Sequence, residues 1–269
     1  MVRVVFWFQR SSVGFALDDS GRLDFGVYIM FKNIWRRFRG KHSYDFADLA
    51  SWQKDILVRA RPFSMGSPER LVATMMAVEY LVHHEVAGAV VECGVWRGGN
   101  MMAAALALQH LGATRLLYLF DTFEGMTAPE DMDIDCSGVP AHFEFERLRK
   151  TPEKTQWCEA SLEDVRANMA STGYPEDLVN LVKGPVEATL PDSAPAEIAL
   201  LRLDTDWYSS TLHELQCLYP RVSQLGVVVI DDYGHWQGAR RAVDEYIASN
   251  GIRCFLHRID YTARQFVKV

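Results

Sequence analysis

Short apolar runs alternate with helical segments over most of this chain, and this alternation restricts the fold more than any other feature of the sequence. The runs with the length and composition of buried strands are 89–93, 115–123, 178–184, 197–206 and 225–234. Strands that alternate with helices build parallel βαβ units, which assemble into a doubly wound sheet. The sequence therefore predicts an α/β fold with a Rossmann-like, mostly parallel sheet, and any ligand is expected beyond the carboxyl ends of its strands.

Helical periodicity and terminal signals mark the segments between these strands. Ser67 is placed to cap a helix that has Pro68 at its first position, and apolar residues recur at helical spacing in the ERLVATMMAVEYLVHH that follows. Further helices are expected at 100–111, 211–219 and 238–248. The C-terminal stretches CFLHRID and RQFVKV are expected to close the sheet as strands.

The first 60 residues differ in character from the rest of the chain. They mix aromatic residues with a basic cluster, Trp35 to Arg39, within FKNIWRRFRGKH. A solvated helix face or a subunit contact is favoured for this cluster over a membrane surface or an acidic partner. We interpret residues 1–60 as an N-terminal helical extension that serves as a lid or an oligomerisation segment, and 61–269 as the Rossmann-like domain. A homo-oligomer is therefore an expectation.

Charge and cysteine content limit the partners and the compartment. With 28 Lys and Arg against 35 Asp and Glu, the formal net charge of -7 argues against nucleic acid, which needs a dense basic patch. The five cysteines are scattered and form no CxxC pair, a pattern typical of reduced thiols. No apolar stretch approaches the roughly 20 residues that span a bilayer, and the first residues lack a signal-peptide cleavage site. We therefore expect a cytoplasmic protein without stable membrane insertion.

The run 89–93 breaks into a glycine-rich turn within VVECGVWRGGN, where Glu92, Gly94, Gly98 and Gly99 stand close together. Such a turn lets a ligand approach the backbone, and the next helix offers its free amides and the positive end of its dipole. The turn does not match GxGxxG, so a tight strand-to-helix turn without a ligand is an equal alternative.

Asp121 ends the next predicted strand, within YLFDTFEGM. A carboxylate at this place accepts hydrogen bonds from both ribose hydroxyls of an adenosine cofactor. Nicotinamide cofactors and S-adenosylmethionine share that geometry, so Asp121 does not distinguish them. An aspartate that only caps the next helix is the alternative.

Two pairs of aspartates follow later strands, Asp204 and Asp206 in RLDTDWY and Asp231 and Asp232 in VVIDDYGHW. Four carboxylates at neighbouring strand ends repel one another unless a cation neutralises them, and an all-oxygen site suits Mg²⁺, with Mn²⁺ or Ca²⁺ as alternatives. Such an ion lowers the pKa of a substrate hydroxyl, and a neighbouring carboxylate then takes its proton. His235 is a further candidate for a base or a substrate contact, ranked below Asp206. The competing interpretation is that these acids are helix caps or surface charges.

Five motifs together resemble the macrocin O-methyltransferase family: VVECGVWRGGN, YLFDTFEGM, LVKGPVEATLP, LRLDTDWYSST and VVVIDDYGHWQGARRAVDEY. That family includes the mycinamicin sugar methyltransferases and the noviose methyltransferase of novobiocin synthesis. The resemblance covers residues 60–250. It implies a class I methyltransferase fold and an enzyme that needs Mg²⁺ and moves a methyl group from S-adenosylmethionine to a hydroxyl of a deoxysugar on an antibiotic.

The resemblance also implies which residues meet the cofactor. It places Asp121 at the ribose, and Ala160 and Ser161, in CEASLEDV, at the adenine. The full set that it assigns to the cofactor is Glu92, Gly94, Val95, Gly98, Asp121, Ala160, Ser161 and Asp204. The small-molecule acceptor is then expected to be a glycoside.

The same resemblance also implies which residues bind the metal ion and which residue acts as the general base. Asp204, Asp231 and Asp232 would bind the ion, and Asp206 would be the general base. Catechol-type enzymes have a lysine shortly after the first metal aspartate, whereas this chain has Trp and Tyr at 207 and 208. That departure argues against a lysine base and favours Asp206.

Three other functions are compatible with parts of the sequence. A phenol or catechol O-methyltransferase would use the same metal-assisted deprotonation, and the residues that select the acceptor are expected in the N-terminal segment and in the loop 127–145. A non-catalytic cofactor-binding module would have no use for four repelling acids. A nicotinamide dehydrogenase is disfavoured because the glycine turn lacks the pyrophosphate fingerprint.

Overall fold

The computed structural model describes residues 46–151 and 154–269. The basic cluster at 35–39 and most of the predicted extension lie outside the described residues, so the role of that segment stays a prediction. From Ala50 to Val269 the chain forms one unit with its own core. This unit contains every residue for which a chemical role is predicted.

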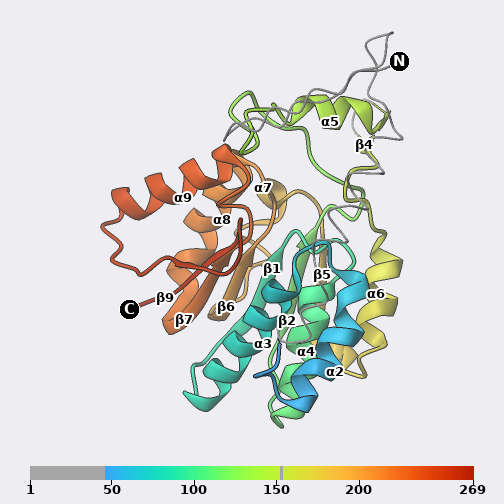
Figure 1. Ribbon diagram of the computed structural model, residues 1–269, viewed down its shortest axis with the longest axis vertical. Coiled ribbons are helices and arrows are strands. Elements are labelled where there is room, and N and C mark those ends of the chain that lie inside the picture. Colours follow the sequence, from blue (N-terminus) through green and yellow to red (C-terminus); the bar gives the residue numbers. More distant parts are fainter. Residues whose placement is uncertain (1–45, 152–153) are drawn as a thin grey trace, which may run out of the picture. The chain divides into compact units, whose positions relative to one another are not determined.

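Within the described residues, seven strands form one sheet in the order β5-β2-β1-β6-β7-β9-β8 (Figure 1). The strands are β1 Ala89–Cys93, β2 Leu117–Asp121, β5 Val179–Lys183, β6 Ile198–Leu203, β7 Val222–Ile230, β8 His257–Arg258 and β9 Arg264–Val267. The first five in that order run parallel, whereas β9 is antiparallel to both β7 and β8. The predicted mostly parallel, doubly wound sheet is therefore confirmed.

Helices cover both faces of this sheet (Figure 1). One face carries α2 Ser51–Ala60, α3 Pro68–His83, α4 Gly99–His110 and α6 Leu162–Ala170, and the other carries α8 Tyr208–Leu218 and α9 Gln237–Ser249. Strand side chains alternate between the two cores, with Val90 in the first and Val91 in the second. Burial on both faces explains why the strands are continuous apolar runs. No helix in the described ranges has the length and apolar character that crossing a bilayer needs.

Short elements connect the main ones: η1 Arg61–Phe63, α5 His142–Arg147, β3 Arg149–Thr151, β4 Lys154–Thr155, η2 Glu176–Leu178, α7 Val186–Thr189 and η3 Tyr219–Arg221. Among the helices, α4 is buried along almost its whole length because α2, α3 and α6 all pack against it. Its alanine-rich sequence suits this place, since alanine has the highest helix propensity and lets neighbouring helices approach closely. This packing fixes the start of α4 directly after the glycine turn.

The ends of three predicted elements are corrected by the structure. The strand predicted at 197–206 ends at Leu203, and Asp206, three residues further on, has a left-handed backbone (φ 70°) that an extended strand does not contain. The helix predicted at 211–219 begins earlier, at Tyr208, and the strand predicted at 225–234 ends at Ile230. The aspartates therefore lie in loops just beyond the strands. Ser67 does occupy the N-cap position of α3, but its side chain makes no capping hydrogen bond.

The register of the parallel strands aligns their carboxyl ends. Cys93 pairs with Phe120 on one side and with Leu203 on the other, and Leu203 in turn pairs with Ile230. The residues that follow these four therefore leave the sheet at one edge: Gly94, Asp121, Asp204 and Asp231. The predicted convergence of the glycine turn and the acids is confirmed.

Candidate active site

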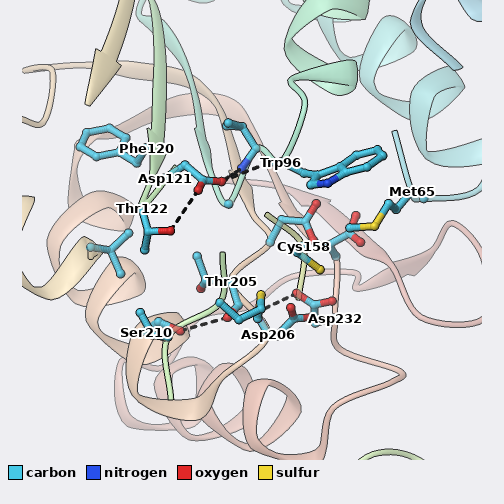
Figure 2. Close-up of a pocket in the computed structure, with 18 of the residues that line it drawn as sticks. Met65, Trp96, Phe120, Asp121, Thr122, Cys158, Thr205, Asp206, Ser210 and Asp232 are labelled. Atoms are coloured by element: carbon cyan, nitrogen blue, oxygen red, sulfur yellow. Dashed lines mark hydrogen bonds between the residues drawn. The ribbon is translucent and has the colours of Figure 1, made fainter. Parts of the chain in front are cut away.

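A cavity of about 380 Å³ opens at this edge of the sheet (Figure 2). Its size is in the range of small-molecule sites. Figure 2 shows Asp121 on one side of the cavity and Asp206 and Asp232 on the other. The predicted site residues on its wall are Gly94, Val95, Asp121, Asp204, Asp206, Asp231, Asp232 and His235.

Four predicted cofactor residues lie outside that wall: Glu92, Gly98, Ala160 and Ser161. Ser161 instead caps α6, because its Oγ accepts a hydrogen bond from Asp164 N at 3.1 Å. The cavity is closed beside β2 by the turn 184–187, which follows the neighbouring strand β5. This turn was not predicted as part of the site, although it belongs to the motif LVKGPVEATLP.

Gly94 sits where the backbones that follow β1 and β6 touch. Its φ is 78°, and a Cβ atom there would lie 1.9 Å from the carbonyl oxygen of Asp204. A side chain at this position would therefore push the glycine turn away from Asp204. The glycine is what allows the turn and the first acidic loop to share one cavity.

We expect Gly94→Ala to lower the free energy of unfolding by about 3 kcal/mol or more, because a backbone clash adds to left-handed strain. Gly112→Ala is the matched control: its φ is 65°, but nothing lies within 4 Å of its Cβ position. The control is expected to lose only about 1 kcal/mol. Urea unfolding of both variants measures the difference, and equal losses would contradict the close-approach explanation.

Asp121 holds the glycine turn from the end of β2. Its Oδ2 accepts the N–H groups of Val95 at 2.8 Å and of Trp96 at 3.1 Å, and its Oδ1 accepts that of Phe123 at 2.8 Å. Burial raises the pKa of Asp121 above its ordinary value. The carboxylate thus fixes the shape of the loop that lines the cavity, and its role at a ribose stays a prediction.

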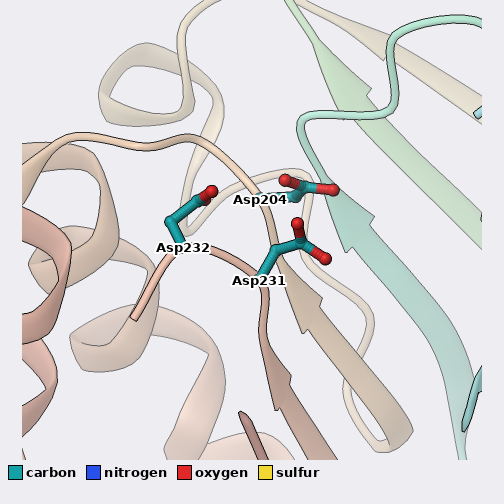
Figure 3. Close-up of side chains that lie close together, drawn as sticks. All are labelled: Asp204, Asp231 and Asp232. Carbon is teal, nitrogen blue, oxygen red and sulfur yellow. The ribbon is translucent and has the colours of Figure 1, made fainter. Parts of the chain in front are cut away.

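Asp204, Asp231 and Asp232, which we call the carboxylate cluster, meet at the ends of β6 and β7 (Figure 3). One oxygen of each lies within 4.8 Å of the others. Burial and the nearby charge of Asp231 raise the pKa of Asp204 well above its ordinary value, and burial and Asp206 do the same for Asp232. The fully ionised cluster is therefore costly without a positive charge beside it.

Asp206 stands in a strained turn next to this cluster. Trp207 N donates to Thr205 O at 2.8 Å, which closes a three-residue turn around the left-handed Asp206. The N–H of Asp206 donates to Asp232 Oδ2 at 3.2 Å. Burial raises the pKa of Asp206 to about 7. Strain of this kind is concentrated at functional sites, where the surrounding structure holds it.

Two hydrogen bonds hold the loop predicted to select the acceptor, 127–145, against the turn that contains Asp206. Trp207, only 1% exposed, donates from Nε1 to the carbonyl of Thr127 at 3.0 Å. The next amide, Tyr208 N, donates to Asp133 Oδ1 at 2.9 Å. Met126 and Thr127 line the cavity. The loop and the turn of Asp206 are therefore positioned together.

Two arginines that were not predicted from the sequence bind the carboxylate cluster. Arg202 of β6, 2% exposed, donates to Glu92 Oε1 at 2.6 Å, to Asp204 Oδ2 at 2.7 Å and to Asp231. Burial alone would lower the pKa of Arg202, but Asp231, Asp204 and Glu92 raise it well above its ordinary value. Burial raises the pKa of Glu92 to about 7 despite this arginine. A charged residue inside the apolar run IALLRL was the signal in the sequence.

Arg70, in the first turn of α3, approaches the cluster from the other side. Its Nε donates to Asp260 Oδ2 at 2.8 Å, and its Nη1 donates to Asp231. Asp260 also accepts the amides of Thr262 and Ala263, at 2.9 and 2.7 Å. Both oxygens of Asp231 are thus held by guanidinium groups, one from Arg70 and one from a strand of the sheet.

With every carboxyl group ionised, the charges around the cluster would not balance within the described residues. Two guanidinium groups, those of Arg70 and Arg202, face six carboxyl groups: Glu92, Asp204, Asp206, Asp231, Asp232 and Asp260. Through these two arginines the chain itself supplies part of the positive charge beside the aspartates. The ionised site would therefore carry an excess of negative charge, which a divalent cation would offset. Carboxylate oxygens can accept a hydrogen bond and bind an ion at once, and an oxygen-only donor set suits Mg²⁺.

Aromatic side chains form the part of the wall beside the acids. Trp157, Trp207 and Trp236 pack together, with ring centroids 5.1 to 6.0 Å apart, and Trp157 and Trp236 line the cavity. His235 makes edge contacts with Trp236 and Tyr261 and lies 3.7 Å from Cys136 Sγ. Burial lowers the pKa of His235. His235 was predicted as a site residue, but the tryptophans of this wall were not, since they come from separate segments of the chain.

Comparison with known proteins decides what kind of protein holds this site. The sequence model of the family described as macrocin-O-methyltransferase (TylF) matches residues 53–268. The chain belongs to this family. It is therefore an O-methyltransferase, and the family resemblance stated from the five motifs is confirmed.

Two relatives of this O-methyltransferase are named as methyltransferases of a tetracenomycin and of a mycinamicin. The 8-demethyl-8-(2,3-dimethoxy-alpha-L-rhamnosyl)-tetracenomycin-C 4'-O-methyltransferase of Streptomyces olivaceus is 36% identical over 200 residues, 74% of this chain and 73% of that protein. The mycinamicin III 3''-O-methyltransferase of Micromonospora griseorubida is 31% identical over 198 residues, 73% of this chain and 75% of that protein.

The fold of the O-methyltransferase agrees with a solved structure. The O-methyltransferase NovP superposes with a TM-score of 0.65 at 29% identity, over 77% of this chain and 82% of that chain. The predicted class I methyltransferase fold is thereby confirmed.

Proposed function

We propose that this O-methyltransferase moves the methyl group of S-adenosylmethionine to a hydroxyl of a deoxysugar on a natural product, with a divalent ion at the carboxylate cluster. One observation carries the proposal: the carboxylate cluster and Asp206 lie on the wall of the cavity that the glycine turn also lines. Donor, ion and acceptor would then share one small-molecule cavity.

The donor is proposed to lie along the glycine turn. Gly94 and Val95 would adjoin its methionine end, where the free amides at the start of α4 favour a carboxylate. Asp121 would hold the ribose, and the turn 184–187 would contact the adenine, because it lines the cavity beside Asp121.

Asp204, Asp231 and Asp232 would hold the ion, with Mg²⁺ favoured over Mn²⁺ or Ca²⁺. When bound, the ion supplies a Lewis acid that lowers the pKa of the acceptor hydroxyl. The excess of carboxylates over guanidinium groups supports this assignment.

Asp206 is proposed as the general base. It lines the cavity beside Asp232, and a pKa of about 7, raised by burial, suits proton transfer at neutral pH. As the acceptor oxygen forms its bond to the methyl carbon, the carbon–sulfur bond breaks, its electron pair stays on sulfur, and the hydroxyl proton passes to Asp206. His235, packed between two aromatic rings, is proposed as an acceptor contact.

A sugar acceptor is supported by the relatives and by the cavity wall. The Streptomyces olivaceus relative is named for a rhamnosyl tetracenomycin. Trp157 and Trp236 offer flat apolar surface next to the acids, against which the apolar face of a sugar ring can pack while its hydroxyls reach the carboxylates. A phenol could use the same wall and is the competing acceptor.

Labelled S-adenosylmethionine, supplied with panels of deoxysugar glycosides and of phenols, tests the acceptor class. We expect methyl transfer to a glycoside with a kcat/KM at least about tenfold above that for any phenol. Transfer to phenols alone would overturn the sugar assignment. Transfer to neither, with normal S-adenosylhomocysteine binding, would favour a non-catalytic binding module.

A further inference from the structure

The side chain of Arg202 connects the carboxylate cluster with the strand that leads into the glycine turn. On β6 it stands between Glu92 of β1 and Val229 of β7 in the strand register. Its Nε donates to Glu92 Oε1 at 2.6 Å, and its Nη2 donates to Asp204 Oδ2 at 2.7 Å and to Asp231. One buried guanidinium group therefore binds two members of the carboxylate cluster and the acid that lies two residues before the glycine turn.

The connection continues from Glu92 to the start of α4. Asn100, in the first turn of that helix, lines the cavity and donates from Nδ2 to Glu92 Oε1 at 3.3 Å. With its amide turned over, Asn100 would instead accept from Arg202 Nε at 3.0 Å. In either orientation, Asn100 is hydrogen-bonded to the Arg202–Glu92 pair. The network thus runs without a break from the carboxylate cluster to the segment that begins at the glycine turn.

We propose that Arg202 is a positioning residue that couples divalent-ion binding to cofactor binding, so that each ligand raises the affinity for the other. This inference rests on the proposed function for the identity of the two ligands. An ion held by Asp204 and Asp231 would order two of the three carboxyl groups that accept hydrogen bonds from Arg202. The pair of Arg202 and Glu92 then holds Asn100, so a cofactor at the glycine turn meets groups that are already ordered. The coupling is reciprocal by thermodynamic necessity.

Calorimetric titration of the full chain measures this coupling directly. Mg²⁺ is titrated with and without saturating S-adenosylhomocysteine, and S-adenosylhomocysteine with and without saturating Mg²⁺. We expect each dissociation constant to fall by about fivefold or more, and by the same factor in both experiments. S-adenosylhomocysteine is the suitable probe because its uncharged sulfur adds no repulsion toward the ion.

Arg202→Lys and Glu92→Gln interrupt the network at two points. A lysine keeps the charge, but a single ammonium group cannot reproduce the fork that spans Glu92 and Asp204. Glu92→Gln removes the negative charge that holds the Arg202 guanidinium next to Asn100, and it leaves the carboxylate cluster unchanged. Both variants are expected to bind Mg²⁺ and S-adenosylhomocysteine with a coupling factor near 1. Arg115→Lys is the matched control, because this half-buried arginine binds the carbonyls of Gly88 and Leu81 at the amino-terminal edge of the sheet, and it should keep the wild-type factor.

The outcomes separate this inference from the proposed function. Wild-type protein that binds both ligands independently overturns the coupling and leaves the proposed function intact. Wild-type coupling that persists in both variants overturns the role of Arg202. If Arg202→Lys does not fold, as judged by its thermal unfolding, Glu92→Gln decides alone. Wild-type protein that binds S-adenosylhomocysteine but no Mg²⁺ overturns the metal part of the proposed function and this inference together.

Discussion

Asp206→Asn is expected to lower kcat by about 10³-fold while the affinity for S-adenosylhomocysteine stays within about twofold of wild type. Asparagine keeps the shape of the side chain and tolerates the left-handed backbone at this position (φ 70°), so the turn is retained. Its amide cannot accept the hydroxyl proton. Single-turnover methyl transfer measures the chemical step, and calorimetry measures cofactor affinity.

A matched variant separates this effect from a general change of surface charge. Asp177, an exposed aspartate of η2, lies outside the cavity wall, and Asp177→Asn should leave kcat unchanged. Full activity of the Asp206 variant would remove this residue from the mechanism.

The pH dependence of kcat gives an independent test of the same base. Burial raises the pKa of Asp206 to about 7, and the carboxylate must be ionised to accept a proton. The rate is therefore expected to fall by about tenfold for each pH unit below the pKa that Asp206 has in the working complex. A bound cation favours the ionised form and moves this acid limb to lower pH. The limb should disappear in Asp206→Asn, and an unchanged acid limb in that variant would assign it to another group.

The fold and the acidic part of the site could be predicted because both follow from local patterns. Apolar runs alternate with helices, and that order alone specifies parallel strands whose carboxyl ends meet. Asp204, Asp231 and Asp232 each follow such a run, so their convergence needed no knowledge of packing. Gly94 was likewise marked by its place in the turn, although its close contact with Asp204 is visible only in the structure.

Residues whose role depends on distant partners could not be placed from the sequence in the same way. Arg202 binds Glu92, 110 residues away along the chain, and Arg70 binds Asp260 across 190 residues. Trp157 packs against Trp236, with ring centroids 6.0 Å apart, although the two residues lie far apart along the chain. A buried charge within an apolar strand does indicate an unknown partner, and Arg202 carried that signal.

Removal of divalent ions with EDTA is expected to abolish turnover, and added Mg²⁺ is expected to restore it. Without the ion, the acceptor hydroxyl keeps its ordinary pKa, and the raised pKa values of Asp204 and Asp232 favour their protonated forms. Mg²⁺ should also raise the midpoint of thermal unfolding, because a ligand that binds only the folded state stabilises it by mass action. Activity that survives exhaustive chelation would defeat the metal assignment.

Asp232→Asn is a sharper test of the ion site than Asp231→Asn. Each carboxylate oxygen of Asp231 accepts a hydrogen bond from an arginine. Asp231→Asn would therefore leave buried guanidinium groups poorly paired and lower the midpoint of thermal unfolding even without Mg²⁺. Asp232 accepts from the main-chain N–H of Asp206, a bond that an asparagine oxygen can keep. The Asp232 variant should therefore lose Mg²⁺ affinity by about 100-fold with a nearly unchanged midpoint in the absence of the ion. Wild-type Mg²⁺ affinity in that variant would mean that the ion binds elsewhere, and Asp206 would then act on a hydroxyl that no cation at this cluster has activated.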